Sequence, residues 1–451
     1  MSTQLVVVGF DEIVARKYLP CLISAINEGH LSSYSIIDLE SEREVISARL
    51  RGVPIAPRHV HYLPNPCAGQ SVSQDLVAEA FGRVTDGSAP IRAYIATEVK
   101  AHESYLRFCV DNGIGSLVEK PVLAPLRDGR FEAPLITPIM RSLIASAARK
   151  PEVRHSVMTL SRYHRVYNDR VIAELAKRVR AWQAPVTSLH LRCAGGVWNR
   201  QEEYEFRDDH PYKFGYGMMM HGAYHYIDLV VQAIQLNRTA LPDHRLRFQV
   251  GAITASPADQ HLRIPISAAA RIGDSEDRWP DSQVPAQHFG ETDVTAMVRL
   301  VDTQSGRTVT MGTLAFEQTT PSVRNWTSLP AGTYNKNGRT SSVDFEVGLS
   351  TLFSAHTHCY DIPTSDPDKI DAFARITTRA NATLYPGEDY VTTEEHHGVF
   401  HSDSNRALMT AWLRGSETRS LLADHLLPMQ LIEAILIAAA NPGRLASVDL
   451  P

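Results

Sequence analysis

The start of the chain pairs a short, wholly apolar run with a segment whose apolar residues recur at helical spacing. Leu5–Val8 is a continuous apolar run that ends at Gly9, and the apolar positions of residues 15–26 then repeat about every 3.6 residues. A second run, Ser35–Asp38, ends on an acidic residue. Continuous apolar runs of this length are typical of parallel strands that are buried on both faces. The pattern predicts a strand, a tight turn, a helix and a second strand.

The same order of elements returns near residue 100. Tyr94–Ala96 form an apolar run, a polar turn follows, and residues 102–112 carry apolar positions at helical spacing. Leu117–Val118 then form another apolar run, which Glu119 and Lys120 follow. Ligands of open α/β sheets bind beyond the carboxyl ends of the strands. We therefore expect Glu119 and Lys120 to face a ligand crevice.

Farther along the chain, the pattern changes to the alternation that half-exposed strands show. We predict strands at Val186–Arg192, Leu246–Thr254, Thr292–Val301 and Arg307–Phe316, and a long apolar helix over 421–440. The passage after Pro121 is rich in turn residues. It indicates a boundary between a first domain, residues 1–125, and a second domain, residues 126–451. Segments 257–287 and 331–339 are insertions to which we assign no role.

The first turn departs from the Gly-x-Gly-x-x-Gly pattern of dinucleotide-binding units. Residues 9–14 read Gly-Phe-Asp-Glu-Ile-Val, so only Gly9 survives, and Asp11 stands where the second glycine lets the backbone approach the pyrophosphate. Two interpretations compete. Asp11 simply caps the helix, or the dinucleotide still binds, shifted outward, with Arg16 or Lys17 neutralising the added charge. Asp38 takes the place of the carboxylate that binds the adenosine ribose, which favours NAD over NADP.

Composition narrows the class of partner and the compartment. The chain has 451 residues, 43% of them hydrophobic and 21% charged, as in ordinary soluble globular proteins, and its length suggests two or three domains. With a net charge of -5 and no basic cluster, neither nucleic acid nor an anionic membrane is expected as a partner. The five cysteines are scattered, without a Cys-x-x-Cys pair, and we find no apolar run of about 20 residues. These features predict a cytoplasmic protein.

Two stretches carry a more specific pattern. The first holds Ile95-Ala96-Thr97, His102 and Glu119-Lys120-Pro121, and the second is Gly215–Asp228. Both resemble the Gfo/Idh/MocA family (glucose-fructose oxidoreductase, inositol dehydrogenase, rhizopine catabolism) of nicotinamide-dependent sugar and cyclitol oxidoreductases. The second stretch aligns without a gap with the family's Gly-Gly-Gly-x-x-x-Asp-x-Gly-x-His-x-x-Asp segment.

The match to the family is broken at several positions. Glu98 replaces the usual proline after the threonine, His221 replaces the first aspartate of the second segment, and Ala223 replaces its last glycine. His225 falls on the family's catalytic histidine and Asp228 on the aspartate that follows it. We expect positions 221, 225 and 228 to share one face of a helix.

The resemblance implies the fold, the cofactor and the site. It implies an α/β Rossmann domain with a doubly wound parallel sheet, followed by an α+β domain with a large open, mainly antiparallel sheet. The last helix, about 421–440, is expected to pack back on the body. A homo-oligomer, a dimer or tetramer, is expected to form through that sheet. The expected cofactor is NAD, with NADP as the alternative, and the expected substrate is a small polyhydroxylated molecule. No metal site is expected.

The expected site falls into three groups. The cofactor-binding residues are Gly9, Phe10, Asp11, Ile13, Asp38, Thr97, His102, Glu119 and Lys120. The substrate-binding residues are Arg162, Tyr163, His164, Tyr224 and Asp228. The catalytic residues are Lys120, His225 and His221.

Oxidising a secondary alcohol needs a base for the hydroxyl proton, a donor that steadies the developing alkoxide, and a hydride acceptor. His225 suits the first task because an imidazole titrates near neutrality, and Lys120 suits the second as an ammonium. The hydride acceptor is the cofactor. A nearby Lys120 cation favours neutral His225, the form that a base needs. With His221 in place of the usual aspartate, Asp228 or the substrate must orient the ring.

Other functions fit parts of the same pattern. A redox-neutral epimerase or lyase would keep the nicotinamide bound. Metal-assisted hydrolysis or elimination would use His221 and His225, whose spacing with Asp228 suits zinc, although no glutamate stands beside His221 as a metalloprotease base. A third alternative is a non-catalytic protein that kept the fold and lost the cofactor turn.

Overall fold

The computed structural model describes residues 3–67, 69–87, 89–196, 199, 204, 212–265, 267, 289–321, 341–363 and 370–450. The chain forms two compact units. The first consists of Met1–Tyr163 and His401–Met429, and the second of His164–Phe400 and Gln430–Pro451. The long apolar helix α13, Leu426–Ala440, therefore begins in the first unit and ends in the second.

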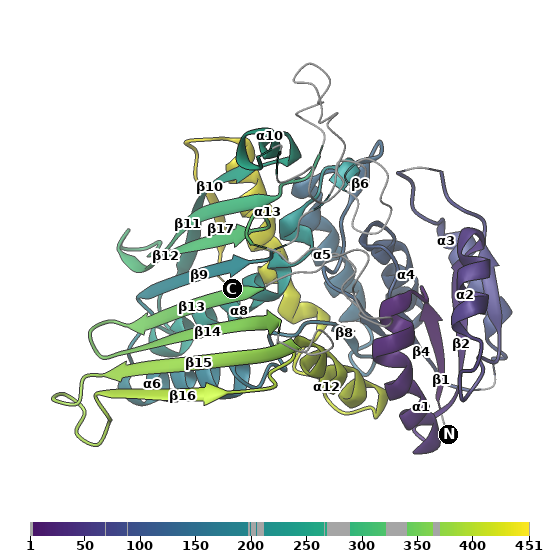
Figure 1. Ribbon diagram of the computed structural model, residues 1–451, viewed down its shortest axis with the longest axis horizontal. Coiled ribbons are helices and arrows are strands. Elements are labelled where there is room, and N and C mark those ends of the chain that lie inside the picture. The colour runs from purple at the N-terminus through teal and green to yellow at the C-terminus, as the bar shows by residue number, and fades with distance from the viewer. Residues whose placement is uncertain are drawn as a thin grey trace. The chain divides into compact units, whose positions relative to one another are not determined.

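A parallel six-stranded sheet forms the centre of the first unit (Figure 1). Its strands lie in the order β3-β2-β1-β4-β5-β8. Their bounds are β1 Thr3–Val8, β2 Leu31–Leu39, β3 Val60–Leu63, β4 Ile91–Ile95, β5 Gly115–Val118 and β8 His155–Val157. The strand order reverses at β1, which pairs with β2 on one side and with β4 on the other. A reversal of this kind opens a ligand crevice at the carboxyl ends of the strands, so the predicted α/β class is confirmed.

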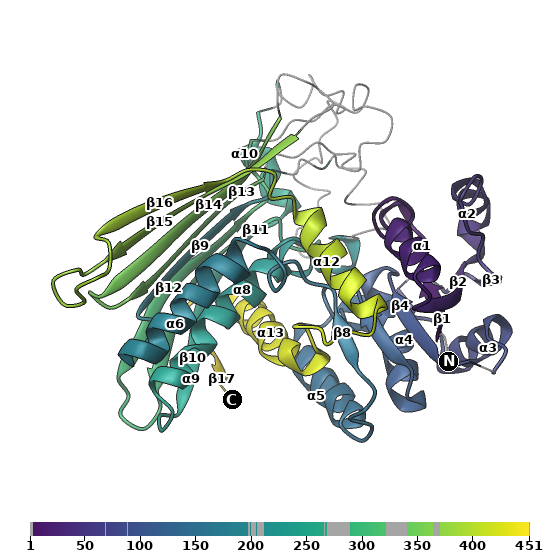
Figure 2. The ribbon, with the colours of Figure 1, turned by 90° about the horizontal axis from the view of Figure 1, so that it is seen from below.

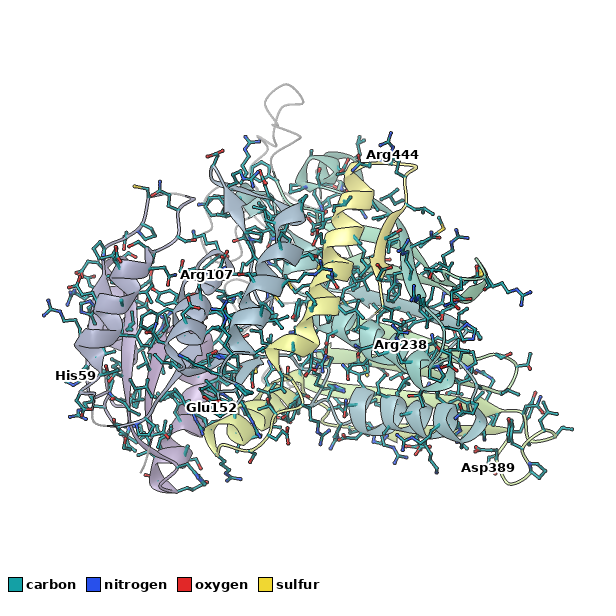
Figure 3. The ribbon with its side chains drawn as sticks, turned by 180° about the vertical axis from the view of Figure 1, so that it is seen from behind. His59, Arg107, Glu152, Arg238, Asp389 and Arg444 are labelled. Carbon is teal, nitrogen blue, oxygen red and sulfur yellow. The ribbon has the colours of Figure 1, made fainter. Side chains whose placement is uncertain are left out.

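Helices cover this sheet: α1 Leu19–Asn27, α2 Arg43–Arg49, α3 Gln74–Val84, α4 Val99–Asn112, α5 Ile136–Ala147 and α12 His401–Leu413. Although α12 is distant in sequence, it lies beside α1, and its Leu408 and Trp412 share one apolar core with Leu22 of α1 (Figure 2). An ion pair of 3.0 Å between Arg414 and Glu28 supports the same contact. On the α4 side, Arg107, which is labelled in Figure 3, donates to the Ser142 hydroxyl of α5 at 3.4 Å.

The domain boundary near residue 125 stays a prediction. By its contacts, the first unit continues to Tyr163, because β8 pairs with β5 in the same sheet. Between these two strands lie the two-stranded hairpin β6 Leu126–Arg127 and β7 Arg130–Phe131, and α5. The loop-rich passage thus leads to a further strand of the first sheet.

A nine-stranded sheet dominates the second unit, in the order β16-β15-β14-β13-β9-β12-β11-β10-β17. Its strands are β9 Ser188–Ala194, β10 Leu246–Ala255, β11 Asp293–Asp302, β12 Thr308–Glu317, β13 Ser342–Leu349, β14 Phe353–Pro363, β15 Ile370–Ala380, β16 Val391–His396 and β17 Ala446–Asp449. The pair β9 and β12 is parallel, and the other neighbours are antiparallel. This confirms the predicted large, mainly antiparallel sheet.

One face of that sheet is covered by helices (Figure 2). The described helices of the second unit include α6 Ala173–Trp182, α8 Ala223–Gln235, α9 Asn237–Ala240 and α10 Gln260–Arg263, besides the last part of α13. Side chains along its strands alternate between the covered face and the exposed face. In β11, Ala296 is fully buried, whereas its neighbour Met297 is 69% exposed. Contrary to the expectation that no apolar run of about 20 residues is present, one helical segment among the described residues, Leu422–Ala440, is long and apolar enough to cross a membrane. Of its apolar window, 56% is buried inside the protein. Core helices of soluble proteins have the same character.

Candidate functional site

The turn after β1 requires a glycine. Gly9 has a φ of +86°, and a Cβ atom there would lie 2.7 Å from the backbone oxygen of Ala96 at the end of β4. Only a residue without a side chain adopts this conformation and permits this approach readily. The ends of β1 and β4 are therefore in direct backbone contact at the crevice.

Two carboxylates occupy the amide groups of this turn. Asp11 accepts the N–H of Val14 at 2.8 Å, and Asp38 accepts the N–H of Phe10 at 2.7 Å. The second oxygen of Asp38 accepts the N–H of Leu39, also at 2.8 Å. The capping interpretation of Asp11 is thus correct in geometry. Backbone groups that bind phosphate in a glycine-rich turn are already paired with side chains of the chain itself.

Burial shapes the charge of both groups. It raises the pKa of Asp11 to about 6, with a smaller contribution in the same direction from the Glu119 carboxylate. The Val14 N–H and the Arg49 guanidinium oppose this rise in the Asp11 pKa. Burial also raises the pKa of Asp38, which the N–H groups of Phe10 and Leu39 moderate. Ile13, also predicted to bind cofactor, contributes its backbone N–H to Asp11.

His102 ties together the two loops at the ends of β4 and β5. Its ring nitrogens lie 3.0 Å from the Thr97 carbonyl oxygen and 2.9 Å from the Pro121 carbonyl oxygen. The residue is only 1% exposed, and burial lowers the pKa of its imidazole. We therefore assign His102 a positioning role behind the crevice. Glu98, which replaces the family's proline, caps α4 by accepting the N–H of Lys100 at 3.0 Å.

Glu119 orients the segment that carries Lys120. Its carboxylate accepts the hydroxyl of the buried Tyr94 at 2.8 Å and lies 3.3 Å from the backbone nitrogen of Lys120. The Lys120–Pro121 peptide bond is cis. Lys120 is half-buried. The nine predicted cofactor residues thus lie at the carboxyl ends of the parallel strands or in the turns and the helix that follow them.

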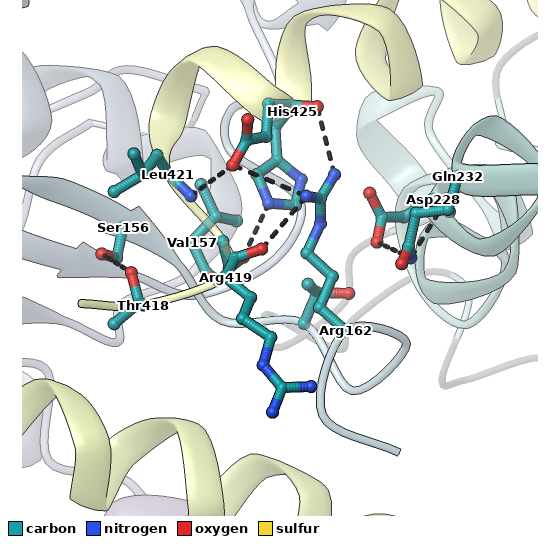
Figure 4. A network of polar contacts seen from close by, with 12 residues as sticks. Ser156, Val157, Arg162, Asp228, Gln232, Thr418, Arg419, Leu421 and His425 are labelled. Atoms are coloured by element: carbon teal, nitrogen blue, oxygen red, sulfur yellow. Dashed lines mark hydrogen bonds and ion pairs between the residues drawn. The ribbon is translucent and has the colours of Figure 1, made fainter. Parts of the chain in front are cut away.

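Arg162 and Tyr163 contact the segment of residues 419–424, which belongs to the first unit. Figure 4 shows Arg162 beside Arg419. Arg162 donates to the carbonyl oxygens of Arg419 at 3.1 Å and Asp424 at 3.3 Å. The Tyr163 hydroxyl accepts the N–H of Arg419 at 3.1 Å. Nearby, Ser420 donates to the Val157 carbonyl oxygen. Both predicted substrate residues therefore help to hold residues 419–424 in place.

In the second unit, the predicted shared helix face of positions 221, 225 and 228 is wrong. His221 follows a 3-10 turn, Met218–Met220, with φ −119° and ψ −98°, and α8 begins only at Ala223. Gly222 separates this turn from α8. The His221 side chain therefore does not continue the row of side chains that His225 and Asp228 form on the helix. His225 and Asp228 do lie on α8, three residues apart. The change weakens the zinc hypothesis, which needed all three on one face.

The other predicted residues of this unit are mostly buried. Tyr224 and Asp228 are 0% exposed and His225 is 8% exposed. Asp228 accepts a hydrogen bond of 2.9 Å from Gln232 one turn later (Figure 4). His164 is 1% exposed and stacks on Tyr167 at a ring distance of 4.2 Å. Within the described residues, no group of three His, Cys, Asp or Glu side chains is placed to hold a metal ion.

Sequence reasoning missed Glu291. This residue lies just before β11, and its carboxylate accepts the N–H of Met219 at 2.8 Å, in the turn that precedes His221. Burial raises the Glu291 pKa to about 7. Gly217 faces it so closely that a Cβ would lie 2.0 Å from the Glu291 carbonyl oxygen. The residue follows a charged stretch with no periodic pattern, so no local signal pointed to it.

No protein-family model and no curated protein sequence matches the chain. Solved structures match it along its whole length. Levoglucosan dehydrogenase in complex with NADH and levoglucosan has a TM-score of 0.55 at 13% identity, with 100% of each chain covered. Aldose-aldose oxidoreductase from Caulobacter crescentus, complexed with glycerol, has a TM-score of 0.55 at 14% identity, again with 100% of each chain covered.

A third structure of this kind is the WlbA dehydrogenase from Bordetella pertussis in complex with NADH and UDP-GlcNAcA. Its TM-score is 0.53 at 15% identity, and 100% of each chain is covered. At such identities the likeness establishes the fold alone. The chain has the two-part fold of these oxidoreductases, a Rossmann-like sheet followed by a large open sheet.

Proposed function

We propose that the protein is an NAD-dependent oxidoreductase that transfers hydride at a secondary alcohol or ketone carbon of a small polyhydroxylated substrate. The observation that carries the proposal is the cluster of residues at the carboxyl ends of the parallel strands, where Gly9 meets Ala96 and Lys120 follows the end of β5 at Val118. The full-length fold likeness to structures that hold NADH and a sugar supports it. A sugar, amino sugar, nucleotide sugar or cyclitol fits this class.

The residues present fit a dinucleotide in part. Gly9 allows the close approach at the strand ends, and Asp38, at the end of β2, is the carboxylate that we propose for the adenosine ribose. A carboxylate there accepts from ribose hydroxyls and repels a 2′-phosphate, which favours NAD; NADP is the alternative. The nicotinamide, when bound, supplies the hydride acceptor. Against the fit stands the pairing of turn amides with Asp11 and Asp38.

We assign proton handling to the chain's own residues. We propose that His225 accepts the substrate hydroxyl proton, and that Lys120 donates a hydrogen bond that stabilises charge developing on a substrate oxygen. Tyr94 and Glu119 hold the backbone on which Lys120 stands. Asp228 is engaged with Gln232. His221 is the third catalytic candidate, and Arg162, Tyr163, His164 and Tyr224 are assigned to substrate binding or its support.

The exposed face of the nine-stranded sheet is our proposed oligomer interface. Met297 and Met311 are 69% and 65% exposed on neighbouring strands β11 and β12. Apolar side chains exposed on a regular sheet are typical of surfaces that bind another subunit. We therefore propose a dimer or tetramer, which sedimentation of the purified protein tests. A monomer at micromolar concentration would contradict it.

The central experiment is direct binding and turnover. Wild-type protein is titrated with NAD, NADH, NADP and NADPH by calorimetry, then assayed with a panel of sugars and cyclitols. Lys120→Ala and His225→Ala are expected to lose at least about 100-fold in turnover, since each removes an acid-base or charge-stabilising group. Lys177→Ala, an exposed lysine on α6, is the matched control. Absence of nicotinamide binding at millimolar concentration would refute the proposal and favour a protein that kept only the fold.

A further inference from the structure

The phosphate turn has lost much of its capacity to bind an anion through the backbone. The N–H groups of Phe10 and Val14 are paired with the carboxylates of Asp38 and Asp11. Those carboxylates also add negative charge where the dinucleotide phosphates would lie. A cofactor phosphate at this crevice therefore needs a cationic side chain.

Arg49 meets this need. It is the last residue of α2, and its guanidinium crosses to the turn, where one nitrogen donates to the Phe10 carbonyl oxygen at 2.9 Å. Its charge acts on both acidic groups, because it lowers the pKa values of Asp11 and Asp38 against the effect of burial. Among the described residues no carboxylate forms an ion pair with it. The remaining guanidinium N–H groups are thus available beside the turn.

The other cations near this turn are engaged elsewhere. Arg16, which the sequence suggested for this task, pairs with Glu12 at 3.2 Å and is 44% exposed. Lys17, the second suggestion, lies over the ring of Tyr18 at 5.1 Å. Arg43, at the other end of α2, pairs with Glu40 at 2.5 Å. The geometry therefore favours Arg49 over both residues named from the sequence.

We propose that Arg49 binds a phosphate group of the cofactor, in place of the amide groups that Asp11 and Asp38 occupy. The inference rests on the proposed function, because it assumes that the crevice takes a nicotinamide dinucleotide. A guanidinium forms two parallel hydrogen bonds with phosphate and keeps its charge at any working pH. The phosphate belongs either to the pyrophosphate, which NAD and NADP share, or to the adenosine 2′-phosphate of NADP.

The test compares Arg49→Ala and Arg49→Lys with Arg51→Ala as the matched control. Arg51 is exposed, lies two residues away and carries the same charge. Calorimetry measures the Kd of NAD, NADP and ADP for each protein, at low and at high salt. We expect Arg49→Ala to weaken phosphate-bearing ligands about 10- to 100-fold, because a hydrogen bond to a charged group contributes about 1.5–3 kcal/mol. Arg49→Lys should recover part of the loss, and Arg51→Ala should lose little.

The ligands distinguish the two phosphates. Equal losses for NAD, NADP and ADP support binding of the pyrophosphate, whereas a loss confined to NADP supports binding of the 2′-phosphate. Unchanged affinities in Arg49→Ala overturn the inference while the proposed function stands. If wild type binds ADP with dependence on Arg49 but neither dinucleotide, the phosphate role stands and the proposed function fails. If wild type binds none of the three, both fail.

Two further measurements distinguish a purely structural role of Arg49 from phosphate binding. Its bond to Phe10 holds the turn, so thermal unfolding shows whether Arg49→Ala remains folded. The salt dependence of Kd reports the charge itself, since salt screens an exposed guanidinium and phosphate pair. A variant that lost only turn geometry would keep the wild-type salt dependence. A flatter salt dependence in Arg49→Ala, restored in Arg49→Lys, is the expected result.

Discussion

The carboxylate of Asp38 accepts the backbone N–H of Phe10 at 2.7 Å, which joins the end of β2 to the turn after β1. Asp38 thus occupies an amide of the kind that binds phosphate in a glycine-rich turn. Together with Asp11, it turns an anion-binding turn into an acidic one.

Cofactor affinity should depend on pH through Asp11. Its pKa of about 6 means that the group is charged at pH 8 and protonated at pH 5. Protonation removes a negative charge beside the phosphates, so NAD should bind more tightly as pH falls from 8 to 5, by at most about tenfold per pH unit above pH 6. The groups that face Asp11 are Glu119, Arg49 and the Tyr94 hydroxyl.

Asp11→Asn is the matched variant for this pH effect, because asparagine also caps helices and carries no charge. Its Kd for NAD, measured by calorimetry between pH 5 and pH 8, should resemble wild type at pH 5 and stay nearly constant. Asp11→Gly should likewise bind NAD more tightly than wild type at pH 8. Parallel pH profiles of wild type and Asp11→Asn would show that Asp11 is only a cap.

Glu291 should make the protein less stable at high pH. Its pKa rises from 4.5 in the unfolded chain to about 7 in the folded protein. The folded state therefore holds the extra proton between these values, and stability contributed by this group is lost as pH rises from about 4.5 through 7. Glu291→Gln removes the titration and keeps an acceptor for the Met219 N–H. Urea unfolding should find it more stable than wild type at pH 8, with the advantage vanishing at pH 4.5.

Glu291→Ala is the contrasting substitution. It leaves the Met219 N–H without its acceptor, which costs about 1–3 kcal/mol for a buried donor. This loss should appear at pH 4.5, where the wild-type acid is neutral. If the proposed site is correct, turnover should fall in Glu291→Ala and recover in Glu291→Gln, because the turn before His221 is restored. Equal stability of the two variants at pH 4.5 would contradict this account.

Gly9→Ala should destabilise the first unit more than Gly52→Ala. Both glycines have a positive φ, +86° and +81°, so both substitutions carry the left-handed strain of about 1–2 kcal/mol. A Cβ at Gly9 also meets the Ala96 oxygen at 2.7 Å, whereas nothing lies within 4 Å of one at Gly52. Overpacking adds about 1–3 kcal/mol at Gly9. Chemical unfolding measures the difference, and equal losses would refute the close contact of β1 and β4.

Much of the fold follows from periodicity that is local in sequence. The apolar run Leu5–Val8 and the helical spacing after Tyr94–Ala96 predicted the parallel sheet, and alternation in 246–254 predicted a strand of the second. Such patterns suffice because a strand or helix must bury one face whatever it packs against. The residues at the ends of β1, β2, β4 and β5 followed from the same rule, since parallel strands end at one edge.

Only the tertiary structure determined which residues that are distant in the chain contact each other. The amide of Phe10 finds Asp38, the guanidinium of Arg49 reaches back to the turn, and Glu291 supports the turn before His221. The packing of α12 in the first unit, far from that unit's other residues in sequence, is another such contact. A carboxylate can accept a hydrogen bond from many backbone amides, and neither composition nor spacing predicts which one it contacts. The contact depends on which strand ends lie side by side, and the burial that results shifts the pKa values of these carboxylates.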